Sequence, residues 1–127
     1  MKYMLLVYAD ENVLSAAERE DCYVKSAQLT QDLYKSGNYV DASPLHLTST
    51  ATSIRVRDQK RLVTDGPFAE TREQLGGYFL IDAPNLDDAI RIAERIPAAR
   101  WGTIEIRPVM EIAGLPVNEK VSKVSIS

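Results

Sequence analysis

The residues best suited to chemistry stand in the stretch TDGPFAETREQLGG, which runs from Thr64 to Gly77. It contains three carboxylates, Asp65, Glu70 and Glu73. A carboxylate such as Asp65 can take a proton from a ligand if burial raises its pKa. Asp65 and the Gly-Pro pair that follows it are also typical of a turn, because an Asp side chain accepts hydrogen bonds from nearby backbone N–H groups and Pro fixes φ. Both interpretations of Asp65, as an acid/base and as a turn residue, stay open on the sequence alone.

The other two acids of the stretch have a structural alternative as well. Pro67 suits the first position of a helix, so Glu70 and Glu73 are predicted to be dipole partners in a first helical turn. If instead they face a cavity, Glu70 is a candidate ligand-binding residue, together with the aromatic side chains of Phe68 and Tyr78. These aromatic residues suit a core or an interface between subunits, and a pocket would share them.

His46 is the one histidine of the chain, and histidine is the residue type whose ordinary pKa lies nearest neutrality, so His46 is the candidate partner of Asp65 in catalysis. A histidine in an extended segment next to a proline is also common at a plain surface. Arg55 and Arg57 share one face of a strand, which indicates either a solvated face or, with Arg107, a clamp for an anionic ligand.

Metal and cofactor chemistry find little support in the composition. With one histidine and one cysteine, Cys22, the chain has few ligands for a zinc site. An all-oxygen site built from the carboxylates of the opening stretch is an alternative without further support, and we expect no metal and no cofactor. Cys22 falls within a predicted helix and suits a structural thiol better than a nucleophile. A single cysteine also forms no internal disulfide, which agrees with a reducing compartment, and we expect a cytoplasmic protein.

Hydrophobic periodicity and the residues typical of helix ends and turns predict where the helices and strands lie. The sequence SAAE opens a helix with the pattern of a capping box, and Gly37 is a suitable residue to end it. A second helix is predicted after Asn85, with a buried stripe that reaches Ile96 and an end at Pro97. Alternation and β-rich composition predict strands over residues 2–9, 39–47, 52–58, 61–64, 77–83 and 102–112.

This order of elements predicts an α+β fold of the ferredoxin-like split βαβ type, with an antiparallel sheet and both helices on one face. The strands at residues 2–9 and 77–83 are apolar on both faces, although two helices can cover only one. An exposed apolar face of that size is unusual for a monomer. We therefore predict a homodimer in which a second copy covers the other face, sheet against sheet.

Chain length and net charge limit the number of domains and the kinds of partner that the protein can have. The 127 residues suit one domain, which we place at 1–114, followed by a polar C-terminal tail at 115–127 that is mobile or exchanged between copies. The net charge of −3 disfavours binding to a phosphate backbone, so we expect no nucleic acid as partner. No apolar run approaches the roughly 20 residues of a membrane span, and we expect no membrane association.

Within the segment from Ile54 to Glu111, the motif DGPFAETRE resembles the DGPFAETKE signature of one branch of the YCII-related family, with Arg72 in place of Lys. The resemblance implies a dimeric α+β barrel. It also implies a small bacterial protein of the kind found beside extracytoplasmic-function sigma factors. The wider family contains a His–Asp pair suggested to be catalytic, and here His46 lies in a different part of the chain from the expected histidine. Trp101 stands where related sequences often have His or Tyr.

Two functions therefore remain open. The first is a small-molecule binding protein or enzyme with a cavity between helices and sheet. It would catalyse proton transfer such as isomerisation or elimination, with Asp65 as acid/base, His46 as partner and Arg55 as anion anchor. The second is a non-catalytic regulatory or interaction module that acts on a protein such as a sigma factor. A structure that places Asp65 and His46 relative to one pocket is the observation that best separates them.

Overall fold

A computed structural model describes residues 1–116 of the chain. It contains six strands, two α-helices and two short 3-10 helices: β1 (Lys2–Ala9), α1 (Ala16–Lys35), β2 (Tyr39–Pro44), η1 (Thr48–Thr50), β3 (Thr52–Arg57), β4 (Lys60–Asp65), β5 (Gln74–Asp82), α2 (Leu86–Ala93), η2 (Pro97–Arg100) and β6 (Thr103–Pro108). The predicted tail at 115–127 lies almost wholly outside the described residues.

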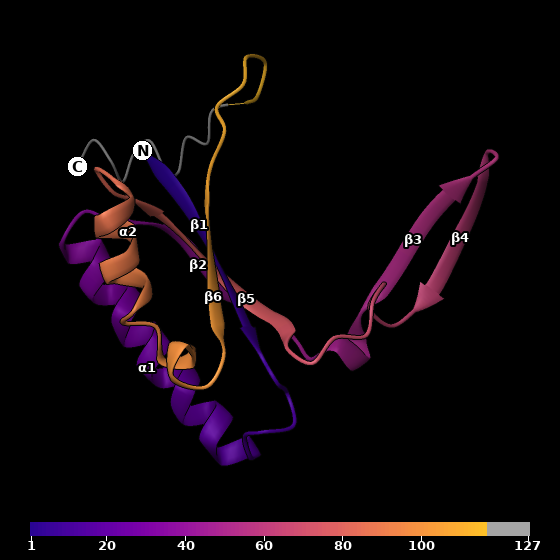
Figure 1. The fold of residues 1–127 in the computed structure, drawn as a ribbon, viewed down its shortest axis with the longest axis horizontal. Coiled ribbons are helices and arrows are strands. Elements are labelled where there is room, and N and C mark those ends of the chain that lie inside the picture. The colour runs from indigo at the N-terminus through magenta and orange to yellow at the C-terminus, as the bar shows by residue number, and fades with distance from the viewer. Residues whose placement is uncertain (117–127) are drawn as a thin grey trace.

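The main sheet has four antiparallel strands in the order β2-β5-β1-β6. Both α-helices lie on one side of it (Figure 1). This is the ferredoxin-like arrangement, with the β3–β4 hairpin inserted between β2 and β5, and it confirms the predicted α+β fold. The prediction succeeds because each helix follows a strand and returns the chain to the same sheet.

Helix α1 begins and ends as its sequence predicts. The Ser15 hydroxyl accepts a hydrogen bond from the N–H of Glu18, and the Glu18 carboxylate accepts one from the N–H of Ser15, which completes the capping box. At the other end Gly37 has a φ of 82°, and the N–H of Asn38 donates to the carbonyl of Leu33. The helix buries Leu29 and Leu33 against the sheet.

Helix α2 is shorter than its apolar stripe predicts. The Asn85 side chain caps it by accepting from the N–H of Asp88, but the helix ends at Ala93. Ile96 is still buried, because the tight turns after the helix carry it into the core. Pro97 begins η2 rather than ending α2, in keeping with the preference of proline for a first helical position.

The core lies between the helices and one face of the sheet. Alternate residues of the two central strands fill it, namely Tyr3 and Leu5 from β1 and Phe79 and Ile81 from β5. Ile104 and Ile106 of β6 pack against the same cluster, as their alternation predicts. Leu5 and Ile81 are fully buried, which identifies the β1–β5 pair as the centre of the fold.

The opposite face of the sheet, which we call the outer face, carries the alternate set of side chains. Its central positions are apolar or aromatic and half-buried, and neither helix covers them: Met4, Leu6 and Tyr8 of β1 and Tyr78 and Leu80 of β5. Charged residues border this group, with Asp41 on β2 and Glu105 and Arg107 on β6. The prediction that β1 and β5 are apolar on both faces is confirmed.

The hairpin formed by β3 and β4, residues 52–65, projects away from the sheet and both helices, and we call it the arm (Figure 1). Its turn has Asp58 and Gln59 at φ of 52° and 63°, the left-handed conformation that tight hairpin turns need. Apart from each other, β3 and β4 make no extensive contact with another described element. The hairpin was predictable from alternation, whereas its projection from the domain was not.

The predicted helix start after Pro67 is wrong, because residues 66–73 form no helix. The segment is the return path from the arm to the sheet, and its polar groups bond locally or to neighbouring strands. The N–H of Gly66 donates to the carbonyl of Ala51 at 2.6 Å, and the Glu73 carboxylate accepts from the Thr103 hydroxyl at 2.8 Å. The segment contains several bends, and β5 begins at Gln74, earlier than predicted. At the other end of the sheet, β6 ends at Pro108, short of the predicted residue 112.

Candidate functional site

A cavity of about 370 Å³ lies between α1 and the helix-covered face of the sheet. Helix α1 contributes Cys22, Tyr23 and Ser26 to its wall, and Trp101 stands at the end of η2. The remaining walls are mostly apolar residues of β1, β2, β5 and the segment after β2, including Val7, Ala42, Leu45, Leu47 and Phe79. The cavity agrees with the location predicted for a ligand, between helices and sheet.

Glu11 lines the cavity and makes hydrogen bonds to several segments around it. Its carboxylate accepts hydrogen bonds from the backbone N–H and the hydroxyl of Thr48, at 2.8 and 2.7 Å. Its own N–H donates to the Gln74 side chain at 3.0 Å, and its carbonyl accepts from the Arg19 guanidinium at 3.0 Å. One residue thus ties the loop after β1 to α1, to η1 and to the start of β5.

Arg19 is the only cationic side chain among the residues that line the cavity. It is half-buried and forms no ion pair within the described part of the chain. Two carboxylates also border the cavity: Glu11 is engaged by Thr48, and Asp10 accepts from the N–H of Asn12. Arg19 therefore retains N–H donors that can bond the oxygen atoms of a ligand. An anionic ligand there would also be repelled by the negative charges of Asp10 and Glu11.

Three other polar groups line the cavity. The pKa of the Cys22 thiol is raised, chiefly by burial and further by the negative charge of Asp21, so the protonated thiol is favoured. This agrees with the prediction that Cys22 is structural. The hydroxyls of Ser26 and Tyr39 have no hydrogen-bond partner among residues 1–116, and both are half-buried. They are the cavity's available neutral hydrogen-bonding groups.

Of the residues predicted for the site, only Tyr78 borders the cavity. Alternation with buried Phe79 directs its side chain to the outer face, where the phenol donates to Asp41 Oδ2 at 2.8 Å. This hydrogen bond is the main cause of the raised pKa of Tyr78, because it favours the neutral phenol. Tyr78 thus connects the β5 wall of the cavity with the outer face.

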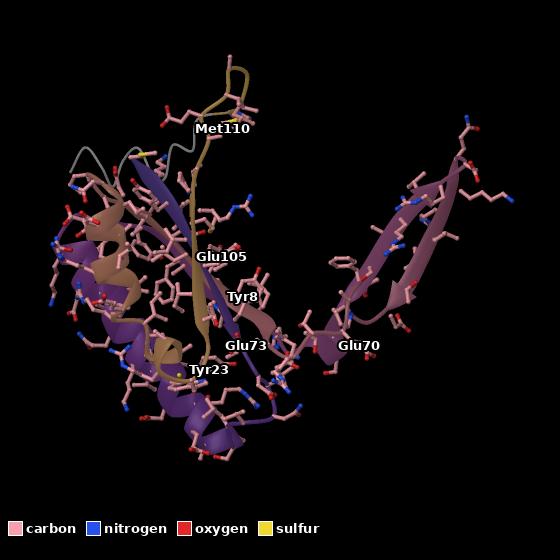
Figure 2. All side chains as sticks on the ribbon, in the orientation of Figure 1. Tyr8, Tyr23, Glu70, Glu73, Glu105 and Met110 are labelled. Carbon is pink, nitrogen blue, oxygen red and sulfur yellow. The ribbon has the colours of Figure 1, made fainter. Side chains whose placement is uncertain are left out.

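The other predicted residues lie elsewhere. Arg55 is in the arm, Asp65 ends β4 at the base of the arm, and Phe68 follows on the return segment with 79 % of its surface exposed. Glu70 stands on the same segment (Figure 2). None of these four lines the cavity of the same protomer. Arg107 belongs to β6 of the main sheet, so the clamp predicted for it with Arg55 would join two separate sheets.

His46 is exposed, between the two cavity-lining leucines Leu45 and Leu47. It shares no hydrogen bond with Asp65 and does not itself line the cavity. A catalytic His46–Asp65 pair stays a prediction. Within residues 1–116, no group of three His, Cys, Asp or Glu side chains is placed to hold a metal ion, and no helix has the length and apolar character to cross a membrane.

Arg19, Ser26, Tyr39 and Trp101 were not predicted as site residues. A signal for the cavity exists in α1, where Cys22, Ser26 and Thr30 recur every four residues and turn small side chains toward the sheet. Small residues on the inner side of an amphipathic helix leave space that larger side chains would fill. Sequence periodicity identifies that side of the helix but does not distinguish a cavity from close packing.

Comparisons with known proteins agree with this fold. The model of the YCII-related domain matches residues 1–113. An uncharacterized protein of Rhizobium meliloti is 36% identical over 114 residues, which are 86% of this chain and 92% of that protein. The structure of 5-chloro-2-hydroxyhydroquinone dehydrochlorinase (TftG) from Burkholderia phenoliruptrix AC1100, in complex with 2,5-dihydroxybenzoquinone, is similar with a TM-score of 0.54 and 12% identity. That similarity covers 87% of this chain and 94% of TftG.

Proposed function

Because this chain belongs to the YCII-related family, we propose that it binds a small ring-shaped organic molecule in the cavity between α1 and the sheet. The observation that supports this most is the lining itself. The lining is mostly apolar, includes the Ser26 and Tyr39 hydroxyls, and has a single cation, Arg19. A mostly apolar pocket with a few convergent polar groups is typical of a small-molecule site.

The size of the cavity indicates the size of the ligand. Ligand pockets range from about 300 to 1,000 Å³, and 370 Å³ lies near the lower limit. This space suits one substituted ring better than a dinucleotide or a peptide. The ring would contact Trp101 and Leu47, and its oxygen substituents would take hydrogen bonds from Arg19, Ser26 or Tyr39.

TftG supports the same ligand class, because that protein of similar fold is described in complex with a dihydroxybenzoquinone. Its name also identifies it as a dehydrochlorinase, which is consistent with an enzymatic form of our proposal, isomerisation or elimination by proton transfer. Asp65 and His46 remain the candidates for acid and base in that form. Neither lines the cavity of its own protomer, so a catalytic role would require a second copy or a rearranged loop.

Ligand binding can be tested with 2,5-dihydroxybenzoquinone and simple hydroxybenzoates as probes, by thermal shift and calorimetry. A probe at 100 times its Kd should add about 2.7 kcal/mol to the free energy of unfolding. Ser26→Trp fills the cavity and should abolish the shift, whereas Gln31→Trp, at an exposed position of the same helix, should retain it. Equal probe binding by both variants would place the site elsewhere.

A cytoplasmic homodimer is part of the proposal. The outer face has an apolar centre that neither helix covers, and a second copy is the simplest cover for it. Sedimentation velocity at micromolar concentration should give a dimer, and a stable monomer would contradict this part. The ligand test stands separately, since the cavity is built within one protomer.

The alternative function is a regulatory or interaction module, for example one that binds a sigma factor. The exposed apolar side chains of the arm favour it, because such surfaces often mark protein contacts. No response to a broad ligand library, together with a stable complex between the purified protein and a purified extracytoplasmic-function sigma factor, would support this alternative.

A further inference from the structure

A second hollow, which we call the groove, lies where the first half of α1 meets the segment from Arg95 to Trp101. It has a volume of about 630 Å³, and its lining includes Ala17 and Lys25 of α1 and Pro97 of η2. Helix α1 and η2 are in direct contact, so the groove follows from the way these two elements pack (Figure 1).

The groove and the cavity share one wall, because Leu14, Cys22 and Trp101 line both. Trp101 is half-buried and packs against the core, yet its indole N–H has no hydrogen-bond partner among residues 1–116. A tryptophan N–H that is removed from water usually finds an acceptor. The two hollows are therefore neighbours with a free donor between them, and a ligand that passes beside Trp101 would occupy both.

The two acids of the groove already have partners. Asp21 forms an ion pair with Lys25, at 3.0 Å between Oδ2 and Nζ. The Glu18 carboxylate accepts the hydrogen bond of the capping box from the N–H of Ser15, at 3.0 Å. Neither acid is therefore the partner of the two arginines that also line the groove.

These two arginines, Arg95 and Arg100, have donors to spare. Arg100 gives one N–H to the carbonyl of Glu94 at 2.6 Å, and Arg95 forms no ion pair within residues 1–116. A guanidinium group presents its N–H donors as a planar fork that matches a carboxylate. With three cations against two acids, the groove has a net charge of +1 and favours an acidic group.

The cavity has the opposite balance, with Arg19 against Asp10 and Glu11. A carboxylate attached directly to a ring in the cavity would face both acids, whereas a carboxylate on a short chain would lie in the groove. We infer that the ligand is a hydroxylated ring with an acidic group on a short chain, with the ring in the cavity and the acid beside Arg95 and Arg100. The inference rests on the proposed function and narrows its ligand class.

A series of probes tests where the acid lies. Dihydroxybenzoate, dihydroxyphenylacetate and dihydroxyphenylpropionate carry the carboxylate progressively farther from the same ring, and the amide of each is its uncharged control. Trp101 is the only tryptophan of the chain, so its fluorescence follows binding, and calorimetry gives the Kd. The propionate should bind at least ten-fold more tightly than its amide. The benzoate should bind no more tightly than its amide.

Variants of the groove identify the residues that hold the acid. Arg95→Gln and Arg100→Gln should each remove most of the difference in Kd between the propionate and its amide. Binding of the amide should stay unchanged, which also shows that each variant is folded. Arg91→Gln makes the same change of charge on α2, outside the groove, and is the matched control.

The outcomes separate this inference from the proposed function. If the propionate and its amide bind the wild type equally, or if the advantage of the propionate survives both arginine substitutions, the groove does not hold the acid. The cavity site would then stand without the groove. If no acid, amide or unsubstituted ring binds the wild type, the proposed function is overturned and the inference with it.

Discussion

The Glu11 carboxylate holds Thr48 at two points, accepting from its backbone N–H at 2.8 Å and its hydroxyl at 2.7 Å. The two residues are far apart in sequence: Glu11 lies in the loop after β1 and lines the cavity, and Thr48 begins η1. This pair fixes the position of Leu47, which precedes Thr48 and lines the cavity. The Glu11 carboxylate thus anchors the segment that carries this lining residue.

Glu11→Gln should lower the free energy of unfolding by about 1–2 kcal/mol, because a charged acceptor is replaced by a neutral one that also presents an unpaired NH₂ group. Urea unfolding measures the change. Glu20→Gln, on the exposed side of α1, is the control and should change the free energy of unfolding by no more than about 0.5 kcal/mol. Equal stability of the two variants would show that Glu11 does not anchor the loop.

The two glycines of β5 should respond differently to the same substitution. A Cβ atom on Gly77 would lie 2.9 Å from the carbonyl oxygen of Ser43 and 3.1 Å from the Pro44 Cα, and both are backbone atoms of β2 that cannot rotate away. A Cβ atom on Gly76 meets only the Val7 carbonyl oxygen, at 3.9 Å. Gly77→Ala should cost about 1–3 kcal/mol of stability in thermal unfolding. Gly76→Ala should be neutral or slightly stabilising, and a reversed order would refute this account of the strand.

Acid should weaken the start of α1 through Glu18. The backbone and hydroxyl hydrogen bonds with Ser15 lower the pKa of Glu18 in the folded protein. Its contribution to stability is therefore present above the pKa of an unfolded glutamate, about 4.3, and is lost as the pH falls through the lower folded value. In Glu18→Gln the unfolding temperature should fall less between pH 6 and pH 3 than in the wild type. Parallel curves for the two proteins would exclude this linkage.

Tyr78 should titrate above ordinary tyrosines. The hydrogen bond to Asp41 raises the pKa of its phenol, so the stabilising contact is present below pH 10, roughly the unfolded value, and is lost as the pH rises through the folded value. Asp41→Ala should lower the pKa of Tyr78, whereas Glu20→Ala should leave it unchanged. Titration of ¹³C-labelled tyrosine by NMR reports the ring directly, and an unshifted Tyr78 resonance in Asp41→Ala would contradict the assignment.

Local signals predicted the fold well. Ser15 with Glu18, Gly37 and Asn85 are helix-end residues whose interactions involve neighbours within a few positions, so the sequence contains both partners of each contact. The same holds for the arm, where alternation and the short turn at Asp58 specify the pairing. The predicted end of α2 was too late, because the apolar stripe included Ile96. Ile96 is buried, but it belongs to the turn after the helix.

The candidate site was less predictable, because its residues meet only through tertiary structure. Arg19, Ser26 and Tyr39 have no motif, and their role follows from the space that small α1 side chains leave above the sheet. The sequence pointed to Asp65, Glu70 and Glu73 as candidate catalytic or ligand-binding residues. In the structure the Glu73 carboxylate accepts a hydrogen bond from Thr103, and Asp65 lies at the base of the arm. Phe68, which a turn does not require, is among the most exposed apolar residues, as a subunit contact would require.

The central place of β1 has a consequence for the order in which the fold forms during synthesis. This first strand pairs with β5 on one side, where Lys2 is opposite Asp82. It pairs with β6 on the other side, where Tyr8 is opposite Thr103. As the chain leaves the ribosome, β1 and α1 emerge long before either neighbour of β1 exists, whereas the arm can close by itself from adjacent residues. The body of the domain is completed only when Pro108 has been made, so its centre is sealed from water only after β6 has been translated.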